Sequence, residues 1–318
     1  MSGFATNSVD HLVRANLWDS QLKEMLLDDL MAMKYVRMID GFTDGDTLNI
    51  PSIGQAEVQD YTEGQAVRYT AMDTGNYTFT IDQYKQSGTT ITNKMKQDSY
   101  YMSELVSSFV PKQHRAIMKK MEADILAKMP DGQTAADTNT INGAYHRFVG
   151  GGTGNVIAIE DFARASYALQ KANVPMTNLV AIVDPTVAYT LGTLTNIVNV
   201  SNNINMDGIV SKNFVTGMKF VANIFGFDVY TSQNLKSGLA ETVNSVAVTN
   251  GVANLFFSAA PGTTMPLIGS LRQPPKVDSS YNKDLQQDEY VTTCRYGFKL
   301  FRPENAVVVI TDNTKVYS

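Results

Sequence analysis

The sequence predicts an α+β protein with a long projecting segment, and three observations support this. Residues 41–92 are mostly polar, with strand patterns at both ends but no apolar run for a core of their own. A long amphipathic helical pattern follows at residues 95–129. Beyond residue 156 the chain alternates helix and strand patterns and then closes in strand-rich sequence.

Length and composition restrict the class of protein. A chain of 318 residues, 43% of them hydrophobic, can build one large or two medium domains. A net charge of -5 argues against a general nucleic-acid-binding protein, because such proteins concentrate Lys and Arg. The single cysteine, Cys294, excludes an internal disulfide and a cysteine-based zinc site. No secretory signal and no apolar run near the ~20 residues of a membrane helix is found, so an aqueous compartment is expected.

The first forty residues are expected to form an arm and a helix. Residues 1–16 are small and polar, which favours a flexible arm. Apolar residues then recur every three or four positions, which predicts a helix that ends near Gly41. The stripe consists of Trp18, Leu22, Met25, Leu26, Met33 and Val36.

The polar segment that follows has strand patterns at residues 47–50 and 77–82. A loop of this length inside a compact domain would be unusual. We therefore expect a two-stranded arm that lies on a neighbouring subunit and buries its surface there.

The predicted long helix carries an apolar stripe and one proline. The stripe is Val110, Ile117, Met118, Met121, Ile125 and Met129. Pro111 predicts either a kink near Ser107 or two helices, with Pro111 in the first turn of the longer one. The sequence Pro130-Asp131-Gly132 then ends the helix.

The chain beyond residue 130 is predicted to form a series of short helices and strands. Residues 131–155 resemble a loop with a short strand at 145–149, and Pro185 begins a short helix. A helix is predicted at 159–172 and strands at 179–183, 228–230, 245–249 and 254–257. The tail, residues 290–301 and 306–310 around a turn at 302–305, predicts a long antiparallel hairpin.

Motifs for catalysis or cofactor binding are incomplete. The glycines from Gly150 to Gly154 suggest a phosphate cradle, but no Gly-Lys-Ser/Thr follows and position 157 is Ile, so a flexible connector between two lobes is favoured. His11, His114 and His146 have no partner at metal-ligand spacing. No Gly-x-Ser-x-Gly elbow is present.

The carboxylates also favour structural roles. Asp184 before Pro185 is an ordinary helix-start signal, although it resembles a strand-end carboxylate of an α/β enzyme. The other candidates lie in polar surroundings, which do not separate the pKa values of a catalytic pair. They are Glu57, Asp60, Glu63, Asp288 and Glu289. No catalytic, cofactor-binding or metal-binding residue is predicted.

The order of these elements resembles the major capsid proteins of tailed bacteriophages, which have the Hong Kong-97 fold. The likeness spans nearly the whole chain and rests on the order and spacing of several short motifs. These are residues 45–51, 79–83, 182–185 with Tyr189 and Leu191, 226–232 and 296–309. The resemblance implies an N-terminal arm at 1–40, an extended β-hairpin loop at 41–92 and an α/β axial domain at 156–270. It also implies a peripheral domain with a long spine helix at 93–155 and 271–318.

In function, the resemblance implies a shell of hexamers and pentamers of this chain around double-stranded DNA, held without sequence-specific binding. Further implied partners are a separate scaffolding protein, a portal protein and a possible cement protein. The expected location is the virion, after assembly in the cytoplasm of the host bacterium, with no membrane contact. No enzyme activity and no cofactor are expected.

Two alternatives stay open at the level of sequence. One is an encapsulin-like nanocompartment shell with the same fold, which would carry a groove for a cargo tail. The other is a soluble α/β hydrolase or transferase centred on Asp184 and the turn from Gly150 to Gly154.

Overall fold

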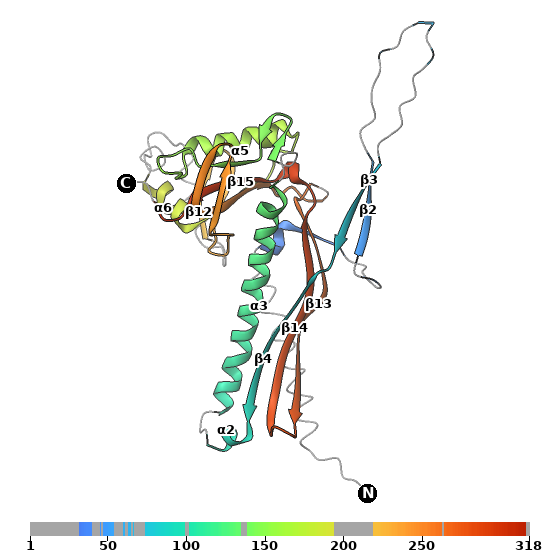
Figure 1. Ribbon diagram of the computed structural model, residues 1–318, viewed down its shortest axis with the longest axis vertical. Coiled ribbons are helices and arrows are strands. Elements are labelled where there is room, and N and C mark those ends of the chain that lie inside the picture. The colour runs from blue at the N-terminus through green and yellow to red at the C-terminus, as the bar shows by residue number, and fades with distance from the viewer. Residues whose placement is uncertain are drawn as a thin grey trace.

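The computed structural model contains two larger β-sheets, a long helix that packs on one of them, and a hairpin that projects from the body (Figure 1). The structure describes residues 32–39, 45, 47–53, 60, 63–64, 66, 74–98, 102–134, 139–193, 219–262 and 264–315. His11, Glu57 and most of the predicted first helix lie outside these ranges.

A four-stranded sheet forms the elongated part of the molecule, with the order β1-β13-β14-β4. Its long hairpin consists of β13 (Leu267–Asn282) and β14 (Gln287–Leu300). Strand β4 (Gln83–Thr92) pairs antiparallel with β14, and β1 (Val36–Met38) pairs parallel with β13. The short 3-10 helix η1 (Ala32–Tyr35) precedes β1, so the predicted helix through Val36 is wrong at its described end.

The long helix α3 (Met102–Gly132) lies along this sheet (Figure 1). Its predicted apolar stripe is confirmed where side chains are described, and it packs against Cys294, Tyr296 and Phe298 of β14. The buried helix residues are Ile117, Met118, Met121, Ile125, Leu126 and Met129. Pro111 lies inside α3, so of the two predicted alternatives the one with Pro111 in a first turn is wrong, and the kink near Ser107 stays a prediction. A short helix, α2 (Asn93–Asp98), connects β4 to this region.

A seven-stranded sheet forms the second lobe, with the order β7-β15-β12-β8-β10-β9 and β11 paired to β12. The strands are β7 (Arg147–Val149), β8 (Leu179–Val183), β9 (Lys219–Ile224), β10 (Phe227–Thr231), β11 (Leu239–Val243), β12 (Val246–Ser258) and β15 (Val307–Asp312). Helices α5 (Ile159–Lys171) and α6 (Pro185–Thr193) accompany it. The predictions of α5, β8 and α6 are confirmed.

Both faces of this sheet are buried, because alternate residues of each strand enter different cores. Val180 and Ile182 of β8 belong to the core that continues to α3, whereas Ala181 and Val183 belong to the core under α5. Central strands buried on both faces read as continuous apolar runs, as the sequences of β8 and β15 do.

Two strand predictions are wrong. The predicted strands at 245–249 and 254–257 are one strand, β12. The predicted closing hairpin does not form, because β14 and β15 lie in different sheets, joined by the 3-10 turn η3 (Pro303–Asn305). The true partner of β14 is β13, whose Pro274 and Pro275 argue against a strand in the sequence. Register shifts between Leu271 and Lys276 accommodate the two prolines.

The division into arm, loop, peripheral domain and axial domain stays a prediction. The pairing shows that β4 belongs to the four-stranded sheet, whereas β7 and β15 belong to the seven-stranded sheet. A further small hairpin, β5 (Thr140–Ile141) and β6 (Ala144–Tyr145), turns at Asn142-Gly143, where both residues have positive φ as a tight hairpin turn requires.

Candidate assembly surfaces

The projecting hairpin consists of β2 (Thr47–Ile53) and β3 (Thr74–Thr80), which form a two-stranded sheet of their own. The strands pair antiparallel from Thr47 opposite Thr80 to Ile53 opposite Thr74. Figure 1 shows that they leave the body on the side away from α3 and the seven-stranded lobe. The predicted pair of strands at the ends of the polar segment is confirmed.

The root of the hairpin packs on its own subunit. Phe79, Ile81 and Ile268 are buried there in a small apolar cluster. Residues packed around them are Ile39, Leu48, Ile50, Tyr77 and Phe301. Beyond the root, the described residues Pro51, Gly75 and Asn76 are exposed. Because an isolated two-stranded hairpin is marginally stable in water, the outer part is suited to packing on another surface.

Polar contacts add to this cluster at one point of the root. The Tyr77 hydroxyl donates to the Leu300 carbonyl at 2.7 Å, and the Lys299 ammonium donates to the Thr78 carbonyl at 2.7 Å. The Lys299 nitrogen also lies 4.6 Å from the centre of the Tyr77 ring, and Phe301 meets that ring edge-on at 5.1 Å. Burial raises the pKa of Tyr77, so its hydroxyl stays a hydrogen-bond donor.

A cavity of about 570 Å³ lies beside these contacts, where the hairpin root, the end of α3 and the end of β14 meet. Its lining is mixed in chemistry, with Lys and Asp side chains next to aromatic rings. The lining residues are Tyr77, Thr80, Asp82, Lys128, Asp131, Gly132, Phe298, Lys299, Leu300, Phe301 and Pro303.

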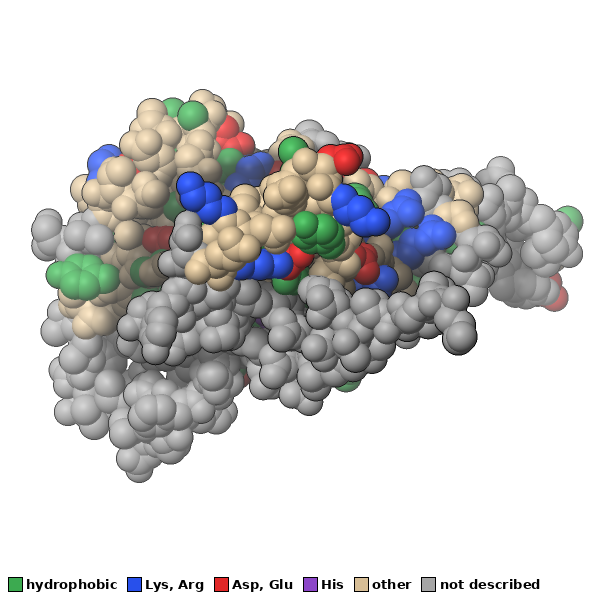
Figure 2. All heavy atoms as spheres, turned by 90° about the horizontal axis from the view of Figure 1, so that it is seen from below, with side chains coloured by type: hydrophobic (Ala, Val, Ile, Leu, Met, Phe, Trp, Pro, Cys, Tyr) green, Lys and Arg blue, Asp and Glu red, His purple; other side chains and the backbone are tan. Residues whose placement is uncertain are grey.

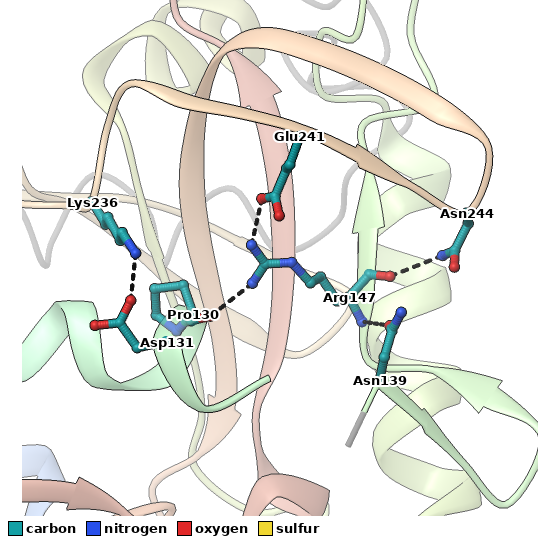
Figure 3. Close-up of polar contacts among 7 residues, drawn as sticks. All are labelled: Pro130, Asp131, Asn139, Arg147, Lys236, Glu241 and Asn244. Carbon is teal, nitrogen blue, oxygen red and sulfur yellow. Dashed lines mark hydrogen bonds and ion pairs between the residues drawn. The ribbon is translucent and has the colours of Figure 1, made fainter. Parts of the chain in front are cut away.

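Arg147 connects the end of α3 to the seven-stranded lobe (Figure 3). Its buried guanidinium donates to the Pro130 carbonyl at 2.9 Å and pairs with Glu241 of β11. Its backbone accepts from Asn244 at 2.9 Å and donates to Asn139 at 3.0 Å. A positive group at a helix C-terminus also interacts favourably with the helix dipole. We call these contacts, together with the Lys236–Asp131 pair, the Arg147 joint.

Neighbouring groups complete the connection between the two sheets. Gln133 donates to the carbonyl of Pro303 at 2.8 Å and also to that of Ala306. The buried His146 Nδ1 lies 3.1 Å from the Ala306 carbonyl, and burial lowers the pKa of this histidine. A Cβ at Gly132 would lie 2.6 Å from Leu300 Cδ2, so the helix end approaches β14 closely.

The glycine turn is part of the seven-stranded lobe, and the prediction of a flexible connector between lobes is wrong. Gly150 N donates to the Ile310 carbonyl at 2.9 Å. Gly151 N and Ala158 N donate to the buried Asp161 carboxylate at 2.9 and 2.8 Å. Burial raises the pKa of Asp161, and its effect outweighs that of these two hydrogen bonds, which lower the pKa. Since a side chain of the protein already accepts from these N–H groups, the turn has no cradle for a phosphate.

Asp184 has the role of a helix cap. Its carboxylate accepts from Thr186 N at 3.0 Å and from Thr186 Oγ1 at 2.6 Å, at the start of α6. This confirms the interpretation of Asp184-Pro185 as a helix-start signal. Both parts of the enzyme site that the sequence suggested, Asp184 and the glycine turn, thus make structural contacts within the chain.

The remaining candidates are not brought together. Asp60 and Glu63 are exposed, Asp288 pairs with Lys96, and Glu289 accepts from Asn282 and Gln287. His114 is buried on α3, away from His146 on the other lobe. Within the described ranges, no three His, Cys, Asp or Glu residues are grouped as metal ligands. Nor is any helix in those ranges long and apolar enough to cross a membrane.

Sequence reasoning missed Arg147, Tyr77 and Lys299. The partners of Arg147 lie 17 and 94 positions away, and Tyr77 lies 223 positions from Leu300. No local pattern marks such contacts. The sequence did hold one signal for Arg147, which lies inside the strand predicted at 145–149. An arginine that is buried in a strand needs a partner for its charge, so this position could have been singled out.

The surface charge is mixed. Figure 2 views the molecule from the end that carries α2, and on the described part of this face Lys and Arg side chains lie among Asp and Glu. Lys94 is exposed on α2, and Lys96 of the same helix pairs with Asp288. On its described part, this face therefore has mixed charge rather than the uniform positive charge that tight nucleic-acid binding needs.

These features define the fold of phage capsid proteins, and solved structures show this directly. A chain from Mycobacterium phage Che8 has 17% identity and a TM-score of 0.64, covering 88% of this chain and 91% of that one. The capsid of cyanophage P-SCSP1u has 14% identity and a TM-score of 0.66, covering 89% and 88%. The chain belongs to the family described as phage capsid protein, whose sequence pattern matches residues 76–309.

A more distant similarity is to a virus-like particle from Pyrococcus furiosus. It has 11% identity and a TM-score of 0.51, and covers 94% of this chain and 99% of that chain. No curated protein matches the sequence. The resemblance to tailed-phage capsid proteins is thus confirmed at the level of fold and family.

Proposed function

We propose that this phage capsid protein is the major capsid protein, whose copies form hexamers and pentamers of an icosahedral shell around double-stranded DNA. The observation that carries the proposal is the hairpin β2–β3, which is anchored at its root and exposes Pro51, Gly75 and Asn76 farther out. Such a hairpin is suited to lie on a neighbouring copy, where it recovers burial that its own subunit does not supply.

The role of the chain in this proposal is mechanical. Stable subunit contacts need on the order of 1,000 Å² or more of buried surface, which an arm on a neighbour supplies together with sheet edges. The net charge of -5 fits a container for DNA, because a basic chain would bind its contents tightly. We propose no enzyme activity and no cofactor for the chain.

The wider setting is part of the same proposal. We include a separate scaffolding protein, a portal protein, a possible cement protein and assembly in the host cytoplasm. The division into arm, extended loop, peripheral domain and axial domain belongs to it as well, with β4 assigned to the peripheral sheet because of its pairing with β14.

An encapsulin-like compartment is the second candidate, and the similarity to the Pyrococcus furiosus particle favours it. That match has the lower TM-score, 0.51 against 0.64 and 0.66 for the two phage chains. Expression of the chain alone separates the two. A compartment protein closes into uniform shells without any further protein, whereas a scaffold-dependent capsid protein yields capsomers or irregular shells.

The first test removes the outer part of the hairpin. Replacing residues 54–73 with Asn-Gly joins β2 to β3 by a tight turn and keeps the root cluster. The variant should keep the melting temperature of the subunit within about 2 °C, since the root cluster keeps all its residues. Under conditions in which the wild type forms shells, with the scaffolding protein co-expressed, this variant should form none by light scattering and electron microscopy.

A matched variant replaces residues 54–73 one for one with Gly and Ser. If only the length of the arm matters, this variant assembles, whereas specific contacts with the neighbour predict that it does not. Normal shells from the Asn-Gly variant would contradict the proposed function of the hairpin. A large fall in its melting temperature would instead mean that residues 54–73 stabilise the fold of the subunit itself.

A further inference from the structure

We propose that Tyr77 and Lys299 are a positioning pair that fixes the direction of hairpin β2–β3 and thereby sets the size of the assembled shell. The part of the proposal about the direction of the hairpin concerns the subunit alone. The part about shell size rests on the proposed function.

Backbone pairing does not set the direction of this hairpin. Its strands form a separate two-stranded sheet, and Ile81 and Asp82 interrupt the strand between β3 and β4. In the described residues, no strand ladder runs from the hairpin to the four-stranded sheet. Side chains at the root must therefore determine the angle at which the hairpin leaves the body.

The apolar cluster at the root attaches the hairpin but restrains that angle only loosely. Burial of Phe79 and Ile81 stabilises the root without a preferred bond direction, so small rotations of the strands cost less than they would for a hydrogen bond. Hydrogen bonds depend on distance and angle, so they resist such a turn. Arg272 donates to the Gly45 carbonyl ahead of β2, which fixes the chain before the hairpin rather than the strands themselves.

Tyr77 is held on several sides by three consecutive residues at the end of β14. The Lys299 nitrogen lies 4.6 Å from the centre of its ring, and the Leu300 carbonyl accepts a hydrogen bond from its hydroxyl at 2.7 Å. Phe301 meets the ring edge-on at 5.1 Å, with an interplanar angle of 84°. Lys299 also donates to the carbonyl of Thr78, the next residue of β3. Together these contacts restrain both the position and the rotation of β3 at one point.

The pair can be removed without unfolding the subunit. Lys299 is exposed, and neither residue belongs to the two larger cores. Tyr77→Phe keeps the ring and removes the donor to Leu300. Lys299→Met keeps the aliphatic chain and removes the charge and the donor to Thr78. Lys299→Arg retains a cation over the ring.

The experiment measures the direction of the hairpin in the unassembled full-length subunit by electron spin resonance. Spin labels are placed on cysteines introduced at Asn76, on the hairpin, and Thr90, on β4, which are both exposed. The native Cys294 is buried, and labelling of the unmodified chain checks that it stays unreactive. The control variant is Lys171→Met, which removes a cation 5.8 Å from the Tyr167 ring on α5.

We expect one narrow distribution of distances between the labels in the wild type, and also in Lys299→Arg and Lys171→Met. In Tyr77→Phe and Lys299→Met this distribution should be at least twice as wide. Melting temperatures should stay within a few degrees in all of them. An unchanged distribution in both Tyr77→Phe and Lys299→Met, or a wild-type distribution that is already broad, would overturn the positioning role.

Measurement of shell diameters by electron microscopy tests whether the pair sets the size of the shell. Tyr77→Phe and Lys299→Met should give a mixture of diameters, whereas Lys171→Met should give the wild-type diameter. Wild-type diameters from variants with a broadened hairpin would overturn the link to shell size. If the wild type forms no shell under any condition, the proposed function fails, and the distance measurement still decides the positioning role.

Discussion

At the scale of single residues, the structure depends on buried polar groups with partners far away in sequence. Arg147 is the clearest case, since it satisfies the carbonyl of Pro130 at the end of α3 and the carboxylate of Glu241 on β11. Removing one member of a buried pair leaves the other without compensation, which costs far more than losing an exposed pair.

Arg147→Met should therefore lower the free energy of unfolding by about 1–3 kcal/mol, because it leaves the Pro130 carbonyl and the partly exposed Glu241 carboxylate without their donor. Lys236→Met is the control at the same joint, since both Lys236 and Asp131 are substantially exposed. That change should cost no more than about 1 kcal/mol. Urea unfolding followed by circular dichroism compares the two variants, and equal losses would contradict the central role of Arg147.

His146 should make stability depend on pH. Burial lowers its pKa in the folded protein, and the nearby Glu304 opposes this only in part. As pH falls below the ordinary histidine value of about 6.5, the unfolded chain therefore binds a proton that the folded chain does not. Its contribution to stability is present above that pH and is lost below it, by up to about 1.4 kcal/mol per pH unit.

The change that tests this is His146→Gln, compared with the wild type in urea unfolding between pH 5 and 8. The variant should lose stability less steeply than the wild type below about pH 6.5. His11 and His114 are present in both proteins, so their contributions cancel in the difference. Parallel curves would show that His146 does not titrate differently in the folded and unfolded states.

At the scale of elements, close backbone approach joins the hairpin to the four-stranded sheet. A Cβ at Gly297 of β14 would lie 2.8 Å from the Ile81 Cα and 2.8 Å from the Thr80 carbonyl oxygen. Both are backbone atoms, at the last residue of β3 and the residue after it, so neither can move aside by a side-chain rotation. Only glycine lets β14 pass this close to the chain that links the hairpin to β4.

Gly297→Ala should therefore displace the link between β3 and β4 and lower stability by about 1–3 kcal/mol. Gly88→Ala in β4 is the matched control, because its Cβ would lie 3.7 Å from the nearest atom, an ordinary contact. Thermal unfolding of both variants gives the comparison. A Gly297→Ala variant as stable as Gly88→Ala would show that the link has room to shift.

Elements with a strong local pattern could be predicted from the sequence. The stripe of Ile117, Met121 and Ile125 and the apolar run of β8 follow from periodicity and burial alone. The pairing of β14 with β13 rather than with β15 could not be predicted, because Pro274 and Pro275 hide the strand character of β13. The pairing of β14 with β4 could not be predicted either, because it joins segments far apart in the chain. The hairpin strands were visible in the sequence, but the Tyr77–Lys299 contacts at their root were not.

At the scale of the whole molecule, the subunit is extended rather than spherical (Figure 1). The four-stranded sheet and α3 run side by side to one end, the seven-stranded lobe lies at the other, and the hairpin projects from the side. This shape exposes much surface for a single chain, which suits a subunit that is stabilised further by its neighbours.

Small-angle X-ray scattering of the unassembled subunit should show this shape. A compact chain of 318 residues would have a radius of gyration of about 20 Å, and we expect a clearly larger value. The variant with Asn-Gly in place of residues 54–73 should give a smaller radius than the wild type. A wild-type radius of about 20 Å, unchanged by that replacement, would mean that the hairpin folds back on the body in solution.

The length of α3 gives the Arg147 joint a mechanical meaning. With 31 residues at 1.5 Å each, the helix extends about 46 Å from the end that carries Pro130, together with the sheet on which it packs. A rotation of this elongated part by about 5° at the Arg147 joint moves its far end by about 4 Å, roughly one residue along a strand. How firmly Arg147 holds the last turn of α3 therefore determines how precisely the far end of the subunit is placed against a neighbouring copy.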